Sequence, residues 1–379
     1  MLTGTRRSVL SRAAGGAADE LTLCATTTAA SETVTIHRMT PLGQNITIYW
    51  GDGDSVVQAP GDLAAESHVY AAASTYQITV SPASAIQQIE LRDAKLSGLQ
   101  SSQLAASPIN YFVAYSLGGA VASIIDSADM AAWTPTTWRL YSMPAGNYTI
   151  NSADMTAWTP SDWRLYSMPA GNYTINSADI IAWRPGDWWL YSMPAGNYTI
   201  NSADMTAWRP SVWYLYSMPV GNYTIDSADM AAWRPTYWYL TTVPAGSYTI
   251  DSADMAAWRP LYWYLFSIAG GGAAWTLTAA DFAGWTGCLV LQIQNNALSS
   301  AQVNAILYGM YQATLARTVN GGMLKVGGTN AAPSGVYQPA AACPVDAATP
   351  GKEVAHELKN DGCDAIAEGK TWLVVDFTA

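Results

Sequence analysis

Charged side chains are scarce in this sequence. Asp, Glu, Lys and Arg make up 12% of its 379 residues, about half the share usual in globular proteins. The 17 Lys and Arg are outnumbered by 28 Asp and Glu, which gives a net charge of −11. A nucleic-acid partner is therefore not expected, because phosphate contacts need a basic face. No stretch approaches the roughly 20 apolar residues of a membrane span, so no membrane span is expected either.

Residues and motifs that carry catalysis are also missing. The chain has only 3 His, and it contains no G-x-S-x-G, H-E-x-x-H or C-x-x-C pattern. Five Asp recur at one spacing, at positions 154, 179, 204, 229 and 254. A Ca²⁺ ladder is one interpretation of this column, but helix capping explains the same residues without a metal. We expect no enzymatic activity, no cofactor and no metal site.

The sequence is instead rich in aromatic residues and in repetition. It contains 17 Trp and 22 Tyr, and the string LYSMPAGNYTINSAD occurs unchanged at 140–154, 165–179 and 190–204. Its starting positions, 140, 165 and 190, give a repeat period of 25. Repeats of this length stack into a solenoid in which each repeat contacts its neighbours. Each repeat is called a coil below.

The ends of the repeat region indicate which kind of solenoid to expect. At 288–298 the chain follows the pattern L-x-x-L-x-L-x-x-N-x-L, in which the apolar and Asn positions are slots 1, 4, 6, 9 and 11. The residues in these slots are Cys288, Leu291, Ile293, Asn296 and Leu298. The same slots hold Ile86, Ile89, Leu91, Ala94 and Leu96 near the start. A step of 25 from Cys288 reaches Trp263, and the equivalent slots of a central coil hold Trp213, Tyr216, Met218, Gly221 and Tyr223.

These residues resemble the leucine-rich repeat family over about 86–312, with aromatic residues in the slots. The resemblance implies a solenoid of short parallel β-strands with short convex helices. Slots 4 and 6 alternate along each strand and would face the interior. After the turn, Asn151, Asn176, Asn201, Asp226 or Asp251 would cap a short helix, with an Asp three residues on in the capping-box position.

The N-terminal part of the chain has a different pattern. It contains W-G-D-G at 50–53, H-V-Y at 68–70 and the alternating Y-Q-I-T-V at 76–80. These motifs resemble the polycystic-kidney-disease (PKD) type of immunoglobulin-like β-sandwich, although Ser74 replaces the usual turn Gly. The implied domains are a flexible tail at 1–18, a β-sandwich cap at 19–82, the solenoid at 83–300 and a C-terminal cap at 301–379. We expect Asp52, Asp54 and His68 to stabilise a tight turn rather than to bind a metal.

Two cysteines bracket a polar loop in the C-terminal cap. Cys343 and Cys363 enclose a segment with little apolar content, and a disulfide would tie down a loop that cannot bury itself. Two free thiols are the alternative. A disulfide would imply an oxidising location.

The candidate binding site is a stripe on the outward face of the concave sheet. With slots 4 and 6 inward, slots 3, 5 and 7 face outward, and slot 2 completes the stripe. Slot 2 holds Arg139, Arg164, Trp189, Tyr214, Tyr239 and Tyr264, and slot 3 beside it holds a Leu column that includes Leu190, Leu215 and Leu240. Exposed apolar stripes of this size mark interaction surfaces. The alternative is that the phase is wrong and Leu belongs to the core, because a one-residue shift exchanges the two faces of a strand.

These features predict a non-enzymatic binding or adhesion protein, extracellular or on a virion surface, that holds a protein or glycan ligand. A structural subunit that binds copies of itself and assembles into a filament is the alternative. The twin-arginine-like start at 5–10 is followed by too short an apolar stretch for an export signal. The N-Y-T sites at Asn147, Asn172, Asn197 and Asn222 are either glycosylation acceptors or turn residues multiplied by duplication.

Overall fold

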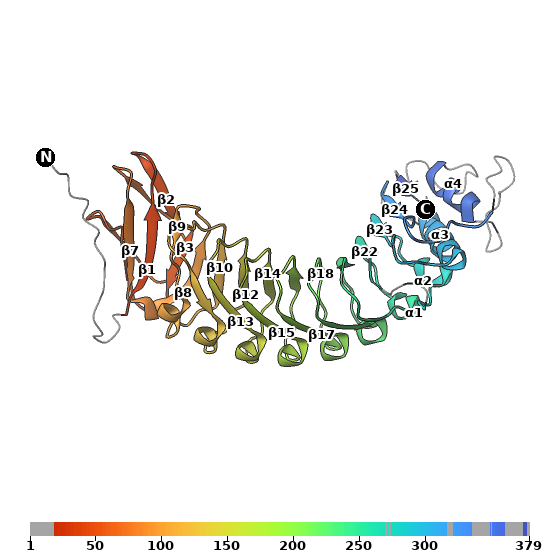
Figure 1. The fold of residues 1–379 in the computed structure, drawn as a ribbon, viewed down its shortest axis with the longest axis horizontal. Helices are drawn as coiled ribbons and strands as arrows, with labels where there is room; N and C mark the ends of the chain where they lie inside the picture. The colour runs from red at the N-terminus through yellow and green to blue at the C-terminus, as the bar shows by residue number, and fades with distance from the viewer. Residues whose placement is uncertain are drawn as a thin grey trace.

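The structure, a computed structural model of the chain, describes residues 19–269, 272, 274–316, 321–335, 349, 351–360 and 374–376. They form an elongated, curved body with a β module at the N-terminal end and two longer helices at the C-terminal end (Figure 1). The expected tail at 1–18 and both Cys343 and Cys363 lie outside the described residues. No helix in these ranges is long and apolar enough to cross a membrane.

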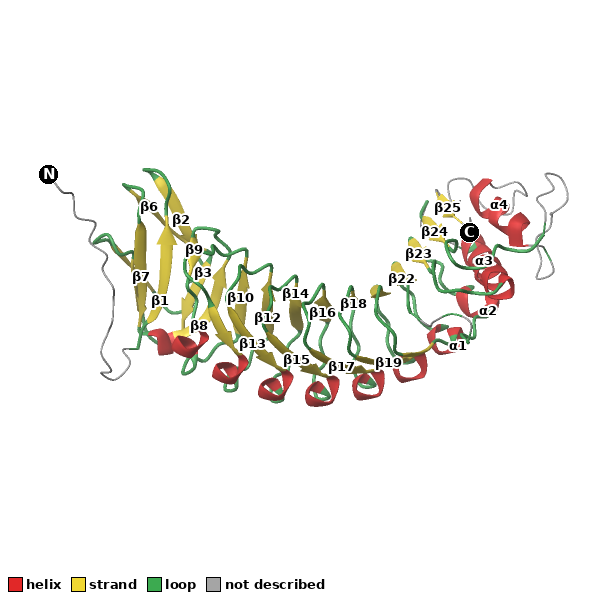
Figure 2. Ribbon diagram, viewed as in Figure 1, coloured by secondary structure: helices red, strands yellow, loops and turns green. Residues whose placement is uncertain are grey.

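One long parallel sheet lines the concave side of the body (Figure 2). Its strands are β8 (Ile86–Leu91), β10 (Tyr111–Tyr115), β12 (Thr137–Tyr141), β14 (Asp162–Tyr166), β16 (Asp187–Tyr191), β18 (Val212–Tyr216), β20 (Tyr237–Thr241), β22 (Tyr262–Phe266), β23 (Val290–Gln292), β24 (Met323–Lys325) and β25 (Val374–Asp376). β3 (Arg38–Pro41) adds an antiparallel strand at the N-terminal edge. The expected repeat solenoid of short parallel strands is confirmed.

A second parallel sheet lies behind the first, and the sequence interpretation missed it. Its strands are β11 (Ile124–Asp126), β13 (Asn147–Asn151), β15 (Asn172–Asn176), β17 (Asn197–Asn201), β19 (Asn222–Asp226) and β21 (Ser247–Thr249). In β17 the side chains of Tyr198 and Ile200 are buried while Asn197 and Thr199 are exposed. The N-Y-T-I-N segment is therefore a half-buried strand and not only a turn that leads to a cap.

Short helical turns line the convex side, and each strand of the second sheet leads into one of them. The turns are η1 (Ala83–Ala85), η2 (Ser101–Leu104), η3 (Ser127–Met130), η4 (Ser152–Met155), η5 (Ser177–Ile180), η6 (Ser202–Met205), η7 (Ser227–Met230), α1 (Ser252–Met255) and α2 (Ala279–Phe282). The predicted caps are confirmed from η4 to α1: Asn176, for example, accepts a hydrogen bond from the backbone N–H of Ala178. Most of these turns are 3₁₀ rather than α-helical.

The Asp column joins neighbouring coils instead of closing a capping box. The buried Ser152 hydroxyl donates to the Asp179 carboxylate of the next coil at 2.5 Å, and it accepts from the backbone N–H of Asn176 at 2.8 Å. The same Ser–Asp hydrogen bond recurs along the solenoid from Ser127 to Ser252 at 2.5–2.6 Å. These hydrogen bonds align each coil with the next.

The core between the two sheets is built from columns of identical side chains. Trp138, Trp163, Trp188, Trp213, Trp238 and Trp263 stack along the first sheet with ring centroids 5.6–5.9 Å apart. A second Trp column, which begins at Trp133 and Trp158, faces it from the return segments, and both columns are fully buried. Burial of each indole contributes a few kcal/mol, so the Trp columns are a main source of cohesion between coils.

The register of the central coils differs from the expected one. Trp263 pairs with Leu291 and not with Cys288, so the last step along the sheet is three positions longer than the repeat period. The residues that fill slots 4 and 6 in a central coil are therefore Trp213 and Leu215. The residues expected in these slots were Tyr216 and Met218, three positions later. Leu190, Leu215 and Leu240 are 0% exposed, and their expected place on the surface is wrong. Tyr216, which was expected inside, faces outward instead.

Antiparallel strands of the N-terminal module join the first coil at two places. The module contains β1 (Leu21–Thr26), β2 (Glu32–Ile36), β4 (Ile46–Tyr49), β5 (Ser55–Gln58), β6 (Glu66–Tyr70) and β7 (Thr75–Ser81), in one sheet with the order β5-β4-β7-β1-β9 and one β2-β6 pair. β1 pairs with β9 (Leu96–Ser97), and β3 pairs with β8. These pairings cover the end of the solenoid core.

Helices close the other end. α3 (Ser300–Leu315) lies at the start of the expected C-terminal cap and begins with a capping box between Ser299 and Gln302. It packs against α2 on one side and α4 (Gly351–Asn360) on the other.

We expect Ser152→Ala to lower the free energy of unfolding by about 2 kcal/mol, because it leaves the Asn176 N–H and one Asp179 oxygen without their partner. Urea denaturation measures this change. Ser161→Ala is the matched control, because Ser161 is exposed and its hydroxyl bonds only to the Thr136 carbonyl. Equal stability of the two variants would contradict a role for the Ser–Asp ladder.

Candidate functional site

Two columns of aromatic side chains face solvent on the concave sheet. They arise because each strand alternates, with its second and fourth residues buried and its third and fifth residues facing outward. The first column, here the central ladder, consists of Trp189, Tyr214, Tyr239 and Tyr264. The second, here the rim ladder, consists of Tyr115, Tyr141, Tyr166, Tyr191 and Tyr216, then Thr241 and Phe266.

The rings of each ladder stack on one another. From Tyr115 to Tyr216 the rim-ladder centroids are 4.2–4.4 Å apart with interplanar angles of 13–14°. In the central ladder, Tyr239 lies 4.0 Å from Tyr214 and 4.1 Å from Tyr264. Because the stacked Tyr rings cover the faces of their neighbours, they present mainly ring edges and phenol hydroxyls to solvent, whereas Trp189 is tilted by 43° against Tyr214.

Charged side chains border the central ladder at its N-terminal end. Arg139 and Arg164 occupy the same column as Trp189, as the sequence predicted. The Arg139 Nε lies 3.0 Å from Asp162, and Arg164 contacts Asp162 at 2.7 Å and Asp187 at 3.0 Å. The Arg164 guanidinium also lies 4.1 Å from the Trp189 ring centre. Both Arg are therefore paired with Asp, and Arg164 also packs on the first ring of the ladder.

Burial keeps the phenols of both ladders neutral. It raises the pKa values of Tyr191 and Tyr216 in the rim ladder and of Tyr214, Tyr239 and Tyr264 in the central ladder. The groups remain hydrogen-bond donors and acceptors without charge well above neutral pH.

A hollow of about 530 Å³ opens between the C-terminal halves of the two ladders. Its lining consists of Trp189, Tyr191, Tyr214, Tyr216, Ser217, Tyr239, Thr241, Thr242, Tyr264 and Phe266. All of these side chains are aromatic or carry a hydroxyl. The hollow suits an uncharged ligand, because a buried charge would lack a partner there.

The structure brings four of the predicted stripe residues together around this hollow, namely Trp189, Tyr214, Tyr239 and Tyr264. It separates the Leu column from them and places it in the core. Sequence reasoning missed the rim ladder, because it assigned Tyr216 and its equivalents to an inward slot. The signal was the Y-L-Y and W-L-Y spacing, in which the two aromatic residues flank a single Leu and must share a face.

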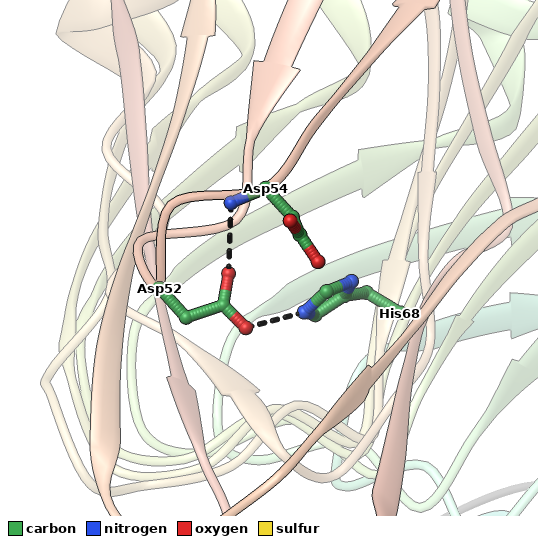
Figure 3. Close-up of side chains that lie close together, drawn as sticks. All are labelled: Asp52, Asp54 and His68. Atoms are coloured by element: carbon green, nitrogen blue, oxygen red, sulfur yellow. Dashed lines mark hydrogen bonds and ion pairs between the residues drawn. The ribbon is translucent and has the colours of Figure 1, made fainter.

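Asp52, Asp54 and His68 form a second cluster of polar side chains, in the N-terminal module (Figure 3). Their potential ligand atoms lie within 4.8 Å of one another. The His68 Nε2 lies 2.6 Å from the Asp52 carboxylate, which also accepts from the Asp54 backbone N–H at 3.2 Å. Partial burial acts to raise the pKa of Asp52, but these hydrogen bonds outweigh it and lower the pKa.

The His68 ring is also held between neighbouring rings, stacked on Trp50 at 5.2 Å and edge-on to Tyr70 at 4.6 Å. Asp52 and Asp54 lie in the turn between β4 and β5, and His68 on β6 holds that turn through its bond to Asp52. The close Asp52–His68 pair already occupies two of the three groups. The repeated Asp column, for its part, accepts the Ser hydroxyls described above.

Comparisons of the chain with protein-family models, with curated proteins and with solved structures found no match. The functional argument therefore depends on the geometry of the concave surface.

The raised pKa values of the ladder phenols predict a loss of stability at high pH. In the unfolded chain phenols lose their protons near pH 10, whereas the folded chain holds them more tightly. The stabilising contribution is complete below pH 10 and is lost as pH rises through the folded pKa values. Absorbance at 295 nm and circular dichroism, followed together, should show a group of phenols that ionises only as the fold is lost. Ionisation of every phenol near pH 10 in a chain that stays folded would contradict buried ladders.

Proposed function

We propose that this chain is a non-enzymatic binding protein of the leucine-rich repeat type, which holds a ligand on its concave aromatic surface. The single observation that carries the proposal is the uncharged hollow between two ladders of stacked rings. Aromatic residues on a concave, largely apolar surface are typical of binding sites.

A protein ligand fits this surface better than a glycan. Sugar stacking needs free ring faces, and neighbouring rings cover most faces within the ladders. The ring edges and hydroxyls that remain suit hydrogen bonds and close apolar packing against a polypeptide. Repetition of the coil repeats the contact, so weak single contacts combine into stronger binding.

The residues that line the hollow support a non-enzymatic role. The lining of the hollow contains no His, Cys, Asp, Glu, Lys or Arg, and the nearby Arg164 is committed to Asp162 and Asp187. We further propose an immunoglobulin-like relationship for the N-terminal module, based on its W-G-D-G and H-V-Y motifs and its antiparallel strands. An extracellular or virion-surface location completes the proposal.

Assembly into a filament is the second candidate. It is favoured by apolar side chains on the N-terminal module, where Leu42, Tyr49, Val57, Leu63 and Val69 are 49–58% exposed. Contact between this apolar end and the opposite end of another copy would join chains head to tail.

The test compares wild-type protein with the double variant Tyr214→Ser/Tyr239→Ser. Ligands are first selected with the wild type from a peptide display library and a glycan array. We expect the variant to stay folded and to bind the selected ligand at least tenfold more weakly, because two central rings of the surface are lost. Calorimetric titration measures binding, and circular dichroism checks the fold.

The matched control is Thr174→Ala/Thr199→Ala, which removes solvent-facing side chains from the second sheet and should bind as the wild type does. Equal binding by the two double variants would contradict the proposed surface. Light scattering and electron microscopy of the wild type decide between a monomeric binder and a filament.

A further inference from the structure

The rim ladder lacks one ring. Its column contains an aromatic side chain in the strands from β10 to β18 and again in β22, but Thr241 of β20 interrupts it. Thr241 pairs in register with Tyr216 on one side and with Phe266 on the other. The central ladder beside it is continuous, because Tyr239 of the same strand stacks on both of its neighbours.

The register of the rim ladder leaves one ring position unfilled at Thr241. Successive rings of the rim ladder lie 4.2–4.4 Å apart, so two steps span about 8.6 Å. A ring placed midway would lie at the same stacking distance from Tyr216 and from Phe266. A puckered sugar ring is thicker than an aromatic ring and fits this spacing less well.

The protein has not closed this gap with its own side chains. Among the described residues, no ring contact joins Tyr216 to Phe266, and both line the open hollow together with Thr241. Thr241 is only 5% exposed, so its side chain is itself covered, and a ring would have to enter above it between Tyr216 and Phe266. One face of Tyr216 is therefore left without the partner that every preceding ring in the column has.

The other walls of the gap are suited to a phenol. Tyr239 stands beside it on the same strand and would meet an inserted ring at the tilted geometry that Tyr214 has with Tyr216, 6.1 Å and 59°. Ser217 and Thr242 line the opposite side and carry hydroxyls. None of these groups is charged.

We propose that this gap receives one tyrosine-type side chain of a partner polypeptide, which completes the rim ladder between Tyr216 and Phe266. Tyr is the residue that the column itself uses at the preceding positions, so the same ring reproduces the same contacts. The proposal rests on the function proposed above, and it identifies the part of the concave surface that anchors the ligand.

The key variant is Thr241→Tyr, which supplies the missing ring from the protein itself. Thr241→Ser is the matched control, because it keeps the gap open. The probe is N-acetyl-tyrosinamide, with p-cresol as the free ring and N-acetyl-leucinamide as an apolar side chain that is not aromatic. Saturation-transfer NMR detects weak binding of each probe, and titration gives its dissociation constant.

We expect the wild type and Thr241→Ser to bind N-acetyl-tyrosinamide equally and at least tenfold more tightly than N-acetyl-leucinamide. Thr241→Tyr should bind it at least tenfold more weakly while its melting temperature equals or exceeds that of the wild type. Unchanged binding by Thr241→Tyr would overturn the proposal. Binding of p-cresol without binding of N-acetyl-tyrosinamide would overturn a polypeptide as the source of the ring.

Phe266→Leu is a second variant, which removes one flanking ring without filling the gap and should also weaken binding at least tenfold.

The experiments distinguish a failure of this proposal from a failure of the proposed function. If Tyr214→Ser/Tyr239→Ser loses the selected ligand but Thr241→Tyr keeps it, the concave surface binds and the gap does not. If neither variant loses the selected ligand, the proposed function itself is wrong.

Discussion

Stacking of one coil on the next in strict register is the constraint on which the rest of the structure depends. A coil has too little core of its own, so its Trp, Leu and Tyr side chains are buried largely against side chains of the neighbouring coils. The Ser–Asp hydrogen bonds reinforce the same alignment on the convex side, where Ser152 bonds to both Asp179 and the backbone of Asn176. Any shift between two coils would break both sets of contacts together.

The same constraint produces the concave surface. Because equivalent residues are held one above the other, a Tyr that faces outward in one coil stacks on the Tyr of the next. The ladders are therefore a direct result of repetition, because the coil stacking that forms the core also aligns their rings. The surface differs between coils where the sequence differs. Arg139 and Arg164 form ion pairs with Asp162 at one end, and Thr241 interrupts the rim ladder.

Repetition in the sequence was sufficient to predict the solenoid, the parallel strands and caps such as Asn176, because each depends on local pattern. The phase of the central strands was not predictable by counting back one repeat period from Cys288. The step from Trp263 to Leu291 is longer than the others, because these two residues pair. Counting back from Cys288 reaches Trp263, and since both residues are apolar, the sequence did not reveal the error. The Leu column was consequently placed outside and Tyr216 inside. The Y-L-Y spacing places Tyr214 and Tyr216 on one face, but only the strand pairing establishes that this is the outer face.

Removal of one whole coil tests this account most directly. Deletion of 163–187 joins Asp162 to Trp188, and every following side chain keeps its place in the register. We predict that this variant folds cooperatively, as circular dichroism and thermal unfolding would show, because each coil contacts only its neighbours. Deletion of 165–188, which is shorter by a single residue, places Arg164 in the buried position of Trp188 and should not fold stably. Failure of the 163–187 deletion to fold, or equal stability of the two deletions, would contradict the account.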